Sequence, residues 1–561
     1  MSEVVEIKNL SISFASDIGE VSAVHDINFN VGSKEIVAIV GESGSGKTVT
    51  SQSILAMLPS SATVKGVIVL SNQEGTVHKS ILDLDAHELQ RVRGAGAAMV
   101  FQEPSSVLNP VYTVGWQIAE ALRAHGNFSK TEIKQKVIEI MKKVGIHDAE
   151  NRYNYYPHEF SGGQKQRIVI AMALVLEPEL IIADEPTTAL DVTVQAEILE
   201  LLRLIRDEFS KSVLLITHNM GVVADLADKV VVMSKGKVVE TGDVNKIFYH
   251  PEVPYTQELM AAIPRINSVV EKGKPPDYST EPLIKVSNFS VTYPGSLGKP
   301  PFYAVKNIDF RIYKDEVLGL VGESGSGKTT TGRALVGLTP ISGGEIDILG
   351  LKLKKGNKNK EYKKIREKIG FVFQDPATSF NPLMTIGQCI AEPLLTFNRY
   401  PSYNDAKKHI AELLDQVDLS ADYASRFPHE LSGGQRQRAG FARALALEPE
   451  LLIADEPTSA LDVKVQAKVL NVFRELQEAY GFACLFITHD LAVVHELADR
   501  IMVMQNGELL ETGTSDEVIK NPQHNYTKRL IASLPIPDPR AQKEHRELLK
   551  RLREAEEKEN T

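Results

Sequence analysis

A repeated octapeptide constrains this chain more than any other feature of its sequence. The residues GESGSGKT run from Gly41 to Thr48 and recur, letter for letter, from Gly322 to Thr329. The residues before and after the octapeptide are also similar in the two copies, which indicates two related halves. A chain of 561 residues is long enough for two to four ordinary domains. The repeat therefore predicts two domains of the same fold, each with its own hydrophobic core.

The octapeptide fits the pattern GxxxxGK[ST], which is typical of phosphate-binding loops. Its glycines let the backbone wrap around an anion at the N-terminus of a helix, where the helix dipole favours negative charge. The lysine would reach the β- and γ-phosphates, and the threonine hydroxyl would bind Mg²⁺. A glycine-rich turn before a core helix is the alternative, and two identical copies weaken it. The predicted nucleotide-binding residues are Gly41, Ser43, Gly44, Gly46, Lys47 and Thr48, and Gly322, Ser324, Gly325, Gly327, Lys328 and Thr329.

Short apolar runs that end in polar residues indicate the parallel strands of an α/β fold. One run leads into each octapeptide, and another leads into Asp184 in the first half and Asp455 in the second. An aspartate at such a strand end can hold a metal ion, and a carboxylate after it can orient and deprotonate a water molecule. The candidates for this second role are Glu185 and Glu456. Acidic residues at strand ends are also common as helix caps or salt-bridge partners. An Asp-Glu pair at a strand end is therefore weak evidence for a catalytic site when it is considered alone.

The order of motifs in each half resembles that of the ABC ATPases. Each half has the octapeptide, a glutamine, SGGQ, a strand with Asp-Glu, a SALD-like turn and a histidine after a strand. The resemblance implies an α/β fold with two tandem P-loop ABC nucleotide-binding domains, each with a RecA-like core, an antiparallel β subdomain and a helical subdomain. It implies ATP and Mg²⁺ as cofactors. The motif residues are Gln102 and Gln374; Ser161, Gly162, Gly163 and Gln164; Ser432, Gly433, Gly434 and Gln435; residues 188–191 and 459–462; and His218 and His489.

The resemblance also implies a role for each motif. In the family, the SGGQ serine and glycine amides complete the ATP site of a partner domain, so Lys47 is expected to share a site with the second SGGQ and Lys328 with the first. The switch histidines contact the γ-phosphate, although core histidines are the alternative. The implied catalytic residues are Glu185, Glu456, His218 and His489, and the implied metal ligands are Thr48, Gln102, Asp184, Thr329, Gln374 and Asp455.

An aromatic residue lies at a matching place on the first strand of each half. These residues are Phe14 in SISF and Tyr293 in SVTY. By resemblance to the A-loop residue of the family, they are expected to stack on the adenine of ATP. Aromatic residues on strands are more often part of a core, and this alternative stays open.

Three further features resemble the oligopeptide/dipeptide/nickel importers, and above all the fused ATP-binding subunits for peptides, microcin C or glutathione. They are QEPSSVLNP and QDPATSFNP after the glutamines, the YT-x-x-L tails and the closing LPIPDP. The resemblance implies an ATPase that powers import of peptides or related small solutes. The implied partners are two integral-membrane permease subunits and, indirectly, an extracytoplasmic solute-binding protein. The implied location is the cytoplasmic face of the inner (plasma) membrane, where the chain is peripheral.

The main alternative is the class of twin-domain ABC proteins that act on ribosomes. Those proteins have a long charged helical linker and no YT tails, whereas residues 266–282 are short and Pro-rich. The expected domains are residues 1–265 and 283–540. Residues 541–561 are expected to form a solvated helix or frayed tail, with a partner-binding helix as the alternative.

The composition narrows the choice of partners and location. A net charge of −10 does not favour binding to nucleic acid. No apolar run approaches the ~18–20 residues that cross a bilayer, and the N-terminus does not resemble a secretory signal. Cys389 and Cys484 are the only cysteines, and both are expected in the core. Many single-domain members of the family that this chain resembles carry a cysteine-rich cluster site after the YT tail. No cysteine follows either YT tail here, so no iron–sulfur cluster is expected.

Overall fold

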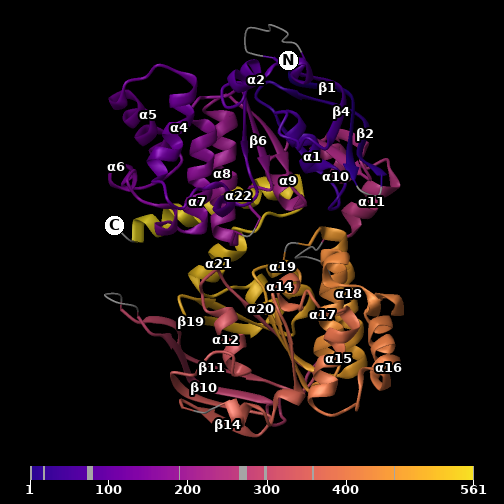
Figure 1. Cartoon of the computed structure of the whole chain (residues 1–561). Coiled ribbons are helices and arrows are strands. Elements are labelled where there is room, and N and C mark those ends of the chain that lie inside the picture. Colours follow the sequence, from indigo (N-terminus) through magenta and orange to yellow (C-terminus); the bar gives the residue numbers. More distant parts are fainter. Residues whose placement is uncertain are drawn as a thin grey trace. The chain divides into compact units, whose positions relative to one another are not determined.

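The computed structural model describes residues 3–16, 19–71, 80–188, 190–263, 275–295, 300–356, 359–459 and 461–559. Contacts between residues divide the chain into two compact units. The first unit comprises Met1–Ile263 and Ser533–Thr561, and the second comprises Pro264–Ala532 (Figure 1). Among the described residues, no helix is both long enough and apolar enough to cross a membrane.

This division differs from the expected domains at the C-terminal end of the chain. Residues 533–540 and the charged tail after them belong to the first unit. Helix α22 (Pro539–Glu559) packs against α9 (Met220–Leu226) and α10 (Val244–Tyr249) of that unit. The charged pattern of α22 indicates a solvated helix, but some of its polar side chains bind groups on the first unit. Residues 266–274 of the expected linker lie outside the described residues.

A six-stranded sheet forms the centre of the first unit, in the order β5-β6-β7-β3-β8-β9. Five strands are parallel, and β9 pairs antiparallel at the edge. The strands β3, β6 and β7 are buried at every residue, which explains why their sequences are apolar except for Asp184 at the end of β6 and Ser212 at the start of β7. The strand bounds are β5 (Ala97–Val100), β6 (Leu180–Asp184), β7 (Ser212–Ile216), β3 (Ile36–Val40), β8 (Lys229–Ser234) and β9 (Lys237–Asp243).

The second unit repeats this sheet in the order β15-β16-β17-β12-β18-β19. Its first five strands are parallel and β19 is antiparallel, as in the first unit. The predicted strands before the octapeptide and before Asp455 are therefore confirmed. The strand bounds are β15 (Ile369–Val372), β16 (Leu451–Asp455), β17 (Ala483–Ile487), β12 (Val317–Val321), β18 (Arg500–Gln505) and β19 (Glu508–Thr514).

Each unit also has a smaller antiparallel sheet. Its order is β2-β1-β4 in the first unit and β11-β10-β13-β14 in the second. Apolar side chains on one face of each sheet join a core that continues onto the parallel strands. The strand bounds are β1 (Glu3–Ser16), β2 (Gly19–Gly32), β4 (Ala62–Leu70), β10 (Ile284–Tyr293), β11 (Phe302–Ile312), β13 (Gly343–Ile348) and β14 (Leu351–Lys354).

Helices that follow Gln102 and Gln374, up to and including the helix that begins in SGGQ, form a third part of each unit. In the first unit α4, α5 and α7 pack on one another, and in the second α15, α16 and α17 do the same. The predicted combination of a RecA-like core, an antiparallel β subdomain and a helical subdomain is thus confirmed in both units. The bounds are α4 (Val114–His125), α5 (Lys130–Lys143), α7 (Gly162–Leu174), α15 (Ile386–Thr396), α16 (Tyr403–Gln416) and α17 (Gly433–Leu445).

The remaining helices connect strands or cover the sheets. Cys389 on α15 and Cys484 on β17 are buried, as predicted. In the first unit these helices are α1 (Lys47–Ser53), α2 (Ala86–Val92), α3 (Pro104–Val107), α6 (Ala149–Arg152), α8 (Val192–Asp207) and α11 (Pro254–Ala261). In the second they are α12 (Lys328–Leu335), α13 (Asn359–Tyr362), α14 (Pro376–Ser379), α18 (Val463–Tyr480), α19 (Leu491–Leu497), α20 (Ser515–Lys520) and α21 (Asn525–Ala532).

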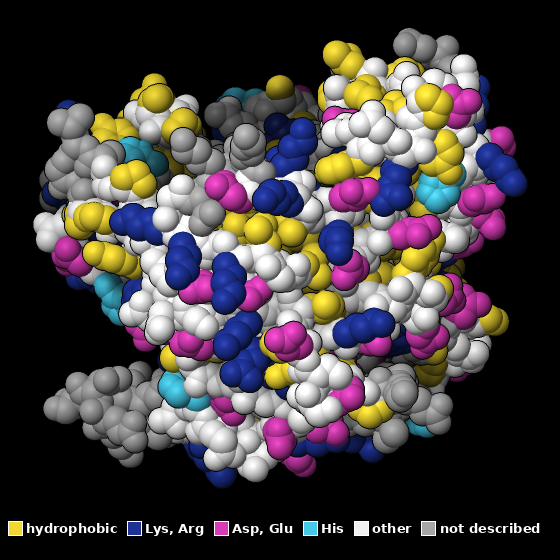
Figure 2. All heavy atoms as spheres, turned by 90° about the horizontal axis from the view of Figure 1, so that it is seen from below, with side chains coloured by type: hydrophobic (Ala, Val, Ile, Leu, Met, Phe, Trp, Pro, Cys, Tyr) yellow, Lys and Arg dark blue, Asp and Glu magenta, His cyan; other side chains and the backbone are white. Residues whose placement is uncertain are grey.

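The charged side chains are spread out on the face that Figure 2 shows. Lysine and arginine side chains alternate there with aspartate and glutamate, and hydrophobic side chains lie among them. The net charge of −10 is therefore not gathered into one acidic patch on this face.

Candidate functional site

The phosphate-binding loop joins β3 to α1 in a tightly curved conformation. Gly41 has a φ of 147°, and a Cβ atom there would lie 2.1 Å from the carbonyl oxygen of Met233. Gly322 in the second unit has a φ of 153° and the same 2.1 Å approach to Met504. Only glycine fits such a position, because any side chain would collide with the next strand. The repeated glycine thus has a steric reason in both units.

The loop lysine of each unit is buried and lies inside its loop. Lys47 Nζ donates hydrogen bonds of 2.8 Å to the carbonyl oxygens of Gly41 and Glu42. Lys328 makes the equivalent two bonds at 2.7 and 2.8 Å. Both lysines lie at the first position of the helix that follows the loop. Their charge is therefore held where the loop and the helix N-terminus would bind a phosphate.

The threonine after each lysine meets the aspartate at the end of a neighbouring strand. Thr48 Oγ1 donates to Asp184 Oδ1 at 3.3 Å, and Thr329 Oγ1 donates to Asp455 Oδ1 at 2.9 Å. Burial raises the pKa of Asp184 to about 6 and raises the pKa of Asp455 as well. Both carboxylates are thus short of the hydration and the donors that would stabilise their charge.

These oxygen atoms fit a magnesium ion. Asp455 Oδ2 is buried and has no hydrogen-bond partner within the described part of the chain, and such an atom is costly unless a cation compensates it. Hydroxyl and carboxylate oxygens are ligands that Mg²⁺ prefers, and it takes its remaining ligands from phosphates and water. The described residues contain no group of three or more His, Cys, Asp or Glu side chains arranged for a metal.

The raised pKa of Asp184 predicts a pH-dependent cost to the metal-free fold. The folded chain holds this proton more tightly than the unfolded chain, so the cost is absent below about pH 4, grows as pH rises, and is complete above about pH 6. Its upper bound is about 3 kcal/mol for a shift from 3.8 to about 6. Asp184→Asn should therefore raise the melting temperature of the metal-free chain at pH 8, and less so at pH 4.5.

The control for this measurement is Asp207→Asn on α8. The hydrogen bond from Arg206 lowers the pKa of Asp207, so removal of this charge should not stabilise the chain at pH 8. A melting temperature of Asp184→Asn at or below that of the wild type at pH 8 would show that the Asp184 charge does not destabilise the metal-free fold.

Glu185 is the centre of a hydrogen-bonded cluster in the first unit. Its Oε2 accepts hydrogen bonds of 2.9 Å from Gln102 Nε2 and from Thr188 Oγ1. Its Oε1 lies 3.2 Å from His218 Nδ1. Glu185 has a φ of 46°, a conformation that non-glycine residues adopt uncommonly and that is frequent at functional sites. The predicted glutamine, glutamate and histidine of the first half thus meet at one point.

The second unit has the same cluster around Glu456. Its Oε2 accepts from Gln374 Nε2 and from Ser459 Oγ, both at 3.0 Å. His489 Nδ1 lies 3.3 Å from the same oxygen, and the φ of Glu456 is 47°. Thr188 and Ser459 are the first residues of the two SALD-like turns, but no role as hydrogen-bond donors to the glutamates was predicted for them from the sequence. A threonine or serine follows the glutamate by three positions in both halves.

Both glutamates are kept ionised by their partners. Burial acts to raise the pKa of Glu185, but the hydrogen bond and charge of His218 outweigh it and hold this pKa below its usual value. His489 does the same for Glu456. Burial acts to lower the pKa of His489, and its bond to Glu456 raises that pKa overall. Each glutamate is therefore a carboxylate at neutral pH.

Each SGGQ motif begins a helix of the helical subdomain. Ser161 is the N-cap of α7, where its Oγ accepts from Gln164 N and the Gln164 side chain accepts from Ser161 N. Ser432 and Gln435 form the same capping box on α17. A Cβ atom at Gly162 would meet nothing within 4 Å, so this helix end is open within its own unit. The expectation that each SGGQ completes the ATP site of the other half stays a prediction.

The two aromatic candidates differ in their surroundings. Phe14 is partly buried and packs against the core below the antiparallel sheet, as Val49 of α1 also does. Tyr293 is 40% exposed, and its hydroxyl lies 3.5 Å from Thr330 Oγ1, directly after the loop threonine. The Tyr293 side chain is thus close to helix α12, which begins at the phosphate-binding loop of the second unit. Their contact with adenine stays a prediction.

Comparison with known proteins identifies the class of these two sites. A family model described as "ABC transporter" matches residues 24–188 and 305–459, which together make up more than half of the chain. The chain belongs to the ABC transporter family. A second family model, "Oligopeptide/dipeptide transporter, C-terminal region", matches residues 239–283 and 510–560 of this ABC protein. Both halves thus carry the tail of peptide-type importers, which favours that class over the ribosome-acting alternative.

Individual ABC relatives match nearly the whole chain. The glutathione import ATP-binding protein GsiA of Escherichia coli (strain K12) is 42% identical over 97% of this chain and 92% of that protein. The protein of the same name from Shigella boydii serotype 4 (strain Sb227) gives the same values. A solved structure titled as the dimeric, post-hydrolysis state of the ATP-binding cassette MJ0796 bound to ADP and Pi is 34% identical, with a TM-score of 0.38. It covers 41% of this chain and 98% of that one. The chain is an ABC ATPase subunit of the importer type.

Proposed function

We propose that this subunit hydrolyses ATP with Mg²⁺ at both phosphate-binding loops and so powers import of a peptide or related small solute. The observation that carries the proposal is the duplicated cluster in which a glutamine, a hydroxyl and a histidine hold an ionised glutamate beside each loop. A single cluster of this kind could be structural. Two copies with nearly equal distances support a shared catalytic task.

The residues divide the reaction among themselves. Lys47, at the start of its helix, would neutralise charge on the β- and γ-phosphates. A magnesium ion bound through Thr48 and Asp184 would stabilise the charge that develops on the phosphate oxygens. Glu185 would accept a proton from the water that attacks the γ-phosphate, and His218 would hold the carboxylate in position. The equivalent residues of the second unit would act in the same way.

Gln102 and Gln374 are suited to report the state of the nucleotide. Each donates to the catalytic glutamate, and each lies just before the segment that leads into the helical subdomain. A shift of the glutamate during hydrolysis would therefore reach the segments Pro104 to Glu159 and Pro376 to Glu430. We propose that these segments dock on the two permease subunits.

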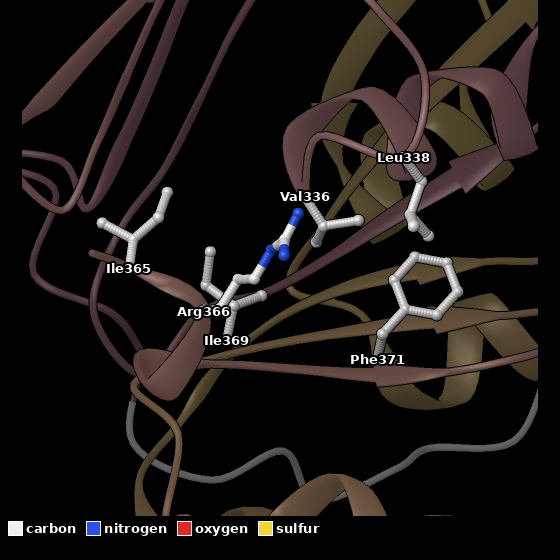
Figure 3. Close-up of a pocket in the computed structure, with 6 residues that line it drawn as sticks. All are labelled: Val336, Leu338, Ile365, Arg366, Ile369 and Phe371. Carbon is white, nitrogen blue, oxygen red and sulfur yellow. The ribbon is translucent and has the colours of Figure 1, made fainter. Parts of the chain in front are cut away.

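Exposed apolar side chains support this docking surface. Val111 and Leu383 follow the two glutamines at the same distance along the chain and are 72% and 86% exposed. Outside the two proposed segments, Met57 and Leu338 lie just after α1 and α12 and are 42% and 56% exposed. In the second unit, Leu338 borders an apolar hollow whose lining is shown in Figure 3: Val336, Leu338, Ile365, Arg366, Ile369 and Phe371. Apolar loops of a membrane partner would bury these side chains.

Replacement of the two most exposed of these side chains should break the docking. The Val111→Asp and Leu383→Asp double variant should lose most co-purification with the permease subunits and most solute uptake, because a buried charge would replace an apolar contact. Its melting temperature should not change, since both side chains are already in water. Val67→Asp on β4, another exposed apolar position, is the matched control. Normal co-purification of the double variant would exclude this surface.

The function itself is tested with the permeases in proteoliposomes. Labelled glutathione is the first solute to try, since the relatives named above import glutathione, and di- and oligopeptides follow. Uptake should require ATP and Mg²⁺ on the side of the membrane where this chain is bound. It should also require a solute-binding protein on the opposite side. ATP hydrolysis that never increases with any permease present would contradict the proposal.

A further inference from the structure

The C-terminal end of the chain belongs to a different unit from the residues just before it. The second unit ends at Ala532, and the first unit resumes at Ser533. The polypeptide therefore passes between the units twice, once near residue 264 and once at residue 532. We call residues 533–559 the C-terminal clasp. Figure 1 shows its helix α22 in yellow beside the purple helix α9 of the first unit.

A buried carboxylate on α9 is the main polar anchor of the clasp. The Asp225 side chain is only 6% exposed. Arg546 donates from Nη2 to Asp225 Oδ1 at 2.9 Å and to its backbone carbonyl at 2.9 Å, and Gln542 Nε2 donates to Oδ1 at 3.0 Å. Arg203 from α8 holds the other oxygen at 2.9 Å. Removal of the clasp would leave this buried charge with fewer donors, which is unfavourable.

A second anchor lies at the end of α10. The Tyr249 hydroxyl donates a hydrogen bond of 2.7 Å to Asp538 Oδ1, and the Arg540 guanidinium lies 4.7 Å from the centre of the Tyr249 ring. Asp538 also accepts from the backbone N–H groups of Arg540 and Ala541. This arrangement fixes the first turn of α22 against the first unit.

A glycine on α9 makes room for the clasp. A Cβ atom at Gly221 would lie 2.3 Å from the backbone carbonyl oxygen of Pro535. The equivalent position of the second unit, in THDLAVV against THNMGVV, is Ala492. The pair Arg203 and Asp225 also has its equivalent there, since Arg474 pairs with Glu496. The two units thus share the ion pair, while the position that contacts the clasp is glycine only in the first.

We propose that the C-terminal clasp is an intramolecular docking segment whose binding surface is formed by Gly221, Asp225 and Tyr249. Its function is to fasten the end of the second unit to α9 of the first, so that two connections join the units. The N-cap of α9 is Asn219, the residue directly after His218. Gly221 and Asp225 therefore lie on the helix that starts beside the cluster around Glu185, while Tyr249 lies on α10. This inference does not depend on the identity of the transported solute.

The experiment cuts the other connection. A protease site is inserted at residue 270 of the full-length chain, which carries an affinity tag at its N-terminus, and the purified protein is cleaved there. Retention of the C-terminal fragment on the tagged one is measured over a dilution series, with EDTA and without nucleotide. The cleaved wild-type fragments should stay together because the clasp remains docked.

Variants on each side of the contact identify its source. Arg546→Ala and Gly221→Ala should each weaken retention at least about tenfold, through loss of the charged contact and through the collision with Pro535. Arg551→Ala, on the exposed face of the same helix, and Ala492→Gly, at the matching place in the second unit, should leave retention unchanged. A cooperative melting transition of each uncut variant, even at a lowered temperature, shows that both units still fold.

Two results would overturn the proposal. One is that the cleaved wild-type fragments separate at the same concentration as the cleaved Arg546→Ala fragments. The other is that Ala492→Gly or Arg551→Ala weakens retention as much as Gly221→Ala does.

Discussion

A chain with both Glu185→Gln and Glu456→Gln is expected to bind ATP normally and to hydrolyse it roughly 10²–10⁴ times more slowly than the wild type. Glutamine keeps the size of the side chain but cannot accept the proton of the attacking water. In the wild type, each carboxylate accepts two hydrogen bonds of 2.9–3.0 Å on Oε2. Because the phosphates are expected to bind the loop and its lysine, which these substitutions leave in place, affinity for ATP should be largely retained.

Two measurements check this expectation. Equilibrium ATP binding is compared with phosphate release under single-turnover conditions, where product release does not limit the rate. Glu208→Gln together with Glu478→Gln is the matched control, since both glutamates are exposed near the ends of α8 and α18. Full turnover by the Glu185→Gln and Glu456→Gln double variant would remove the glutamates from the mechanism.

Lys47→Ala alone and Lys328→Ala alone are each expected to reduce ATP hydrolysis by far more than half. Removal of a preorganised charge that stabilises the transition state typically costs roughly 10²–10³ in rate. If the two sites worked independently, each variant would retain half of the activity. A larger loss from each variant follows if hydrolysis needs both nucleotides, as the family resemblance implies.

The matched geometry of the two sites is the reason to expect equal effects. The two loop lysines make the same pair of hydrogen bonds, and the two glutamates have the same three kinds of partner. The exchange of Phe14 for Tyr293 should change adenine stacking by less than about 1–1.5 kcal/mol, the value of an aromatic pair.

The measurement is permease-coupled ATP hydrolysis by each single variant. Lys65→Ala and Lys352→Ala, which change exposed lysines on the antiparallel sheets, serve as controls. Near-normal turnover by either loop variant would show that the two sites are functionally unequal despite their matched residues.

The C-terminal tail shows where prediction from the sequence was incomplete. The pattern of Lys, Glu and Arg after Asp538 is typical of a solvated helix. Arg546 and Gln542 look like surface residues in that pattern, yet they bind the buried Asp225. A helical pattern gives the faces of a helix but not the identity of a distant partner, since Asp225 lies 321 residues before Arg546.

The sequence by itself determined the repeat, the phosphate-binding loops, the strands before them and the candidate residues of each half. These features depend on short stretches whose glycines, apolar runs and strand-end acids have local physical causes. Only the tertiary structure decided that Gln102 and Glu185, 83 residues apart, share a hydrogen bond. This contact requires β5 to lie beside β6 in the sheet, and strand order is set by packing of the whole unit. The position of the C-terminal clasp was decided in the same way, by a glycine, a buried aspartate and a tyrosine that the chain brings together only when it is folded.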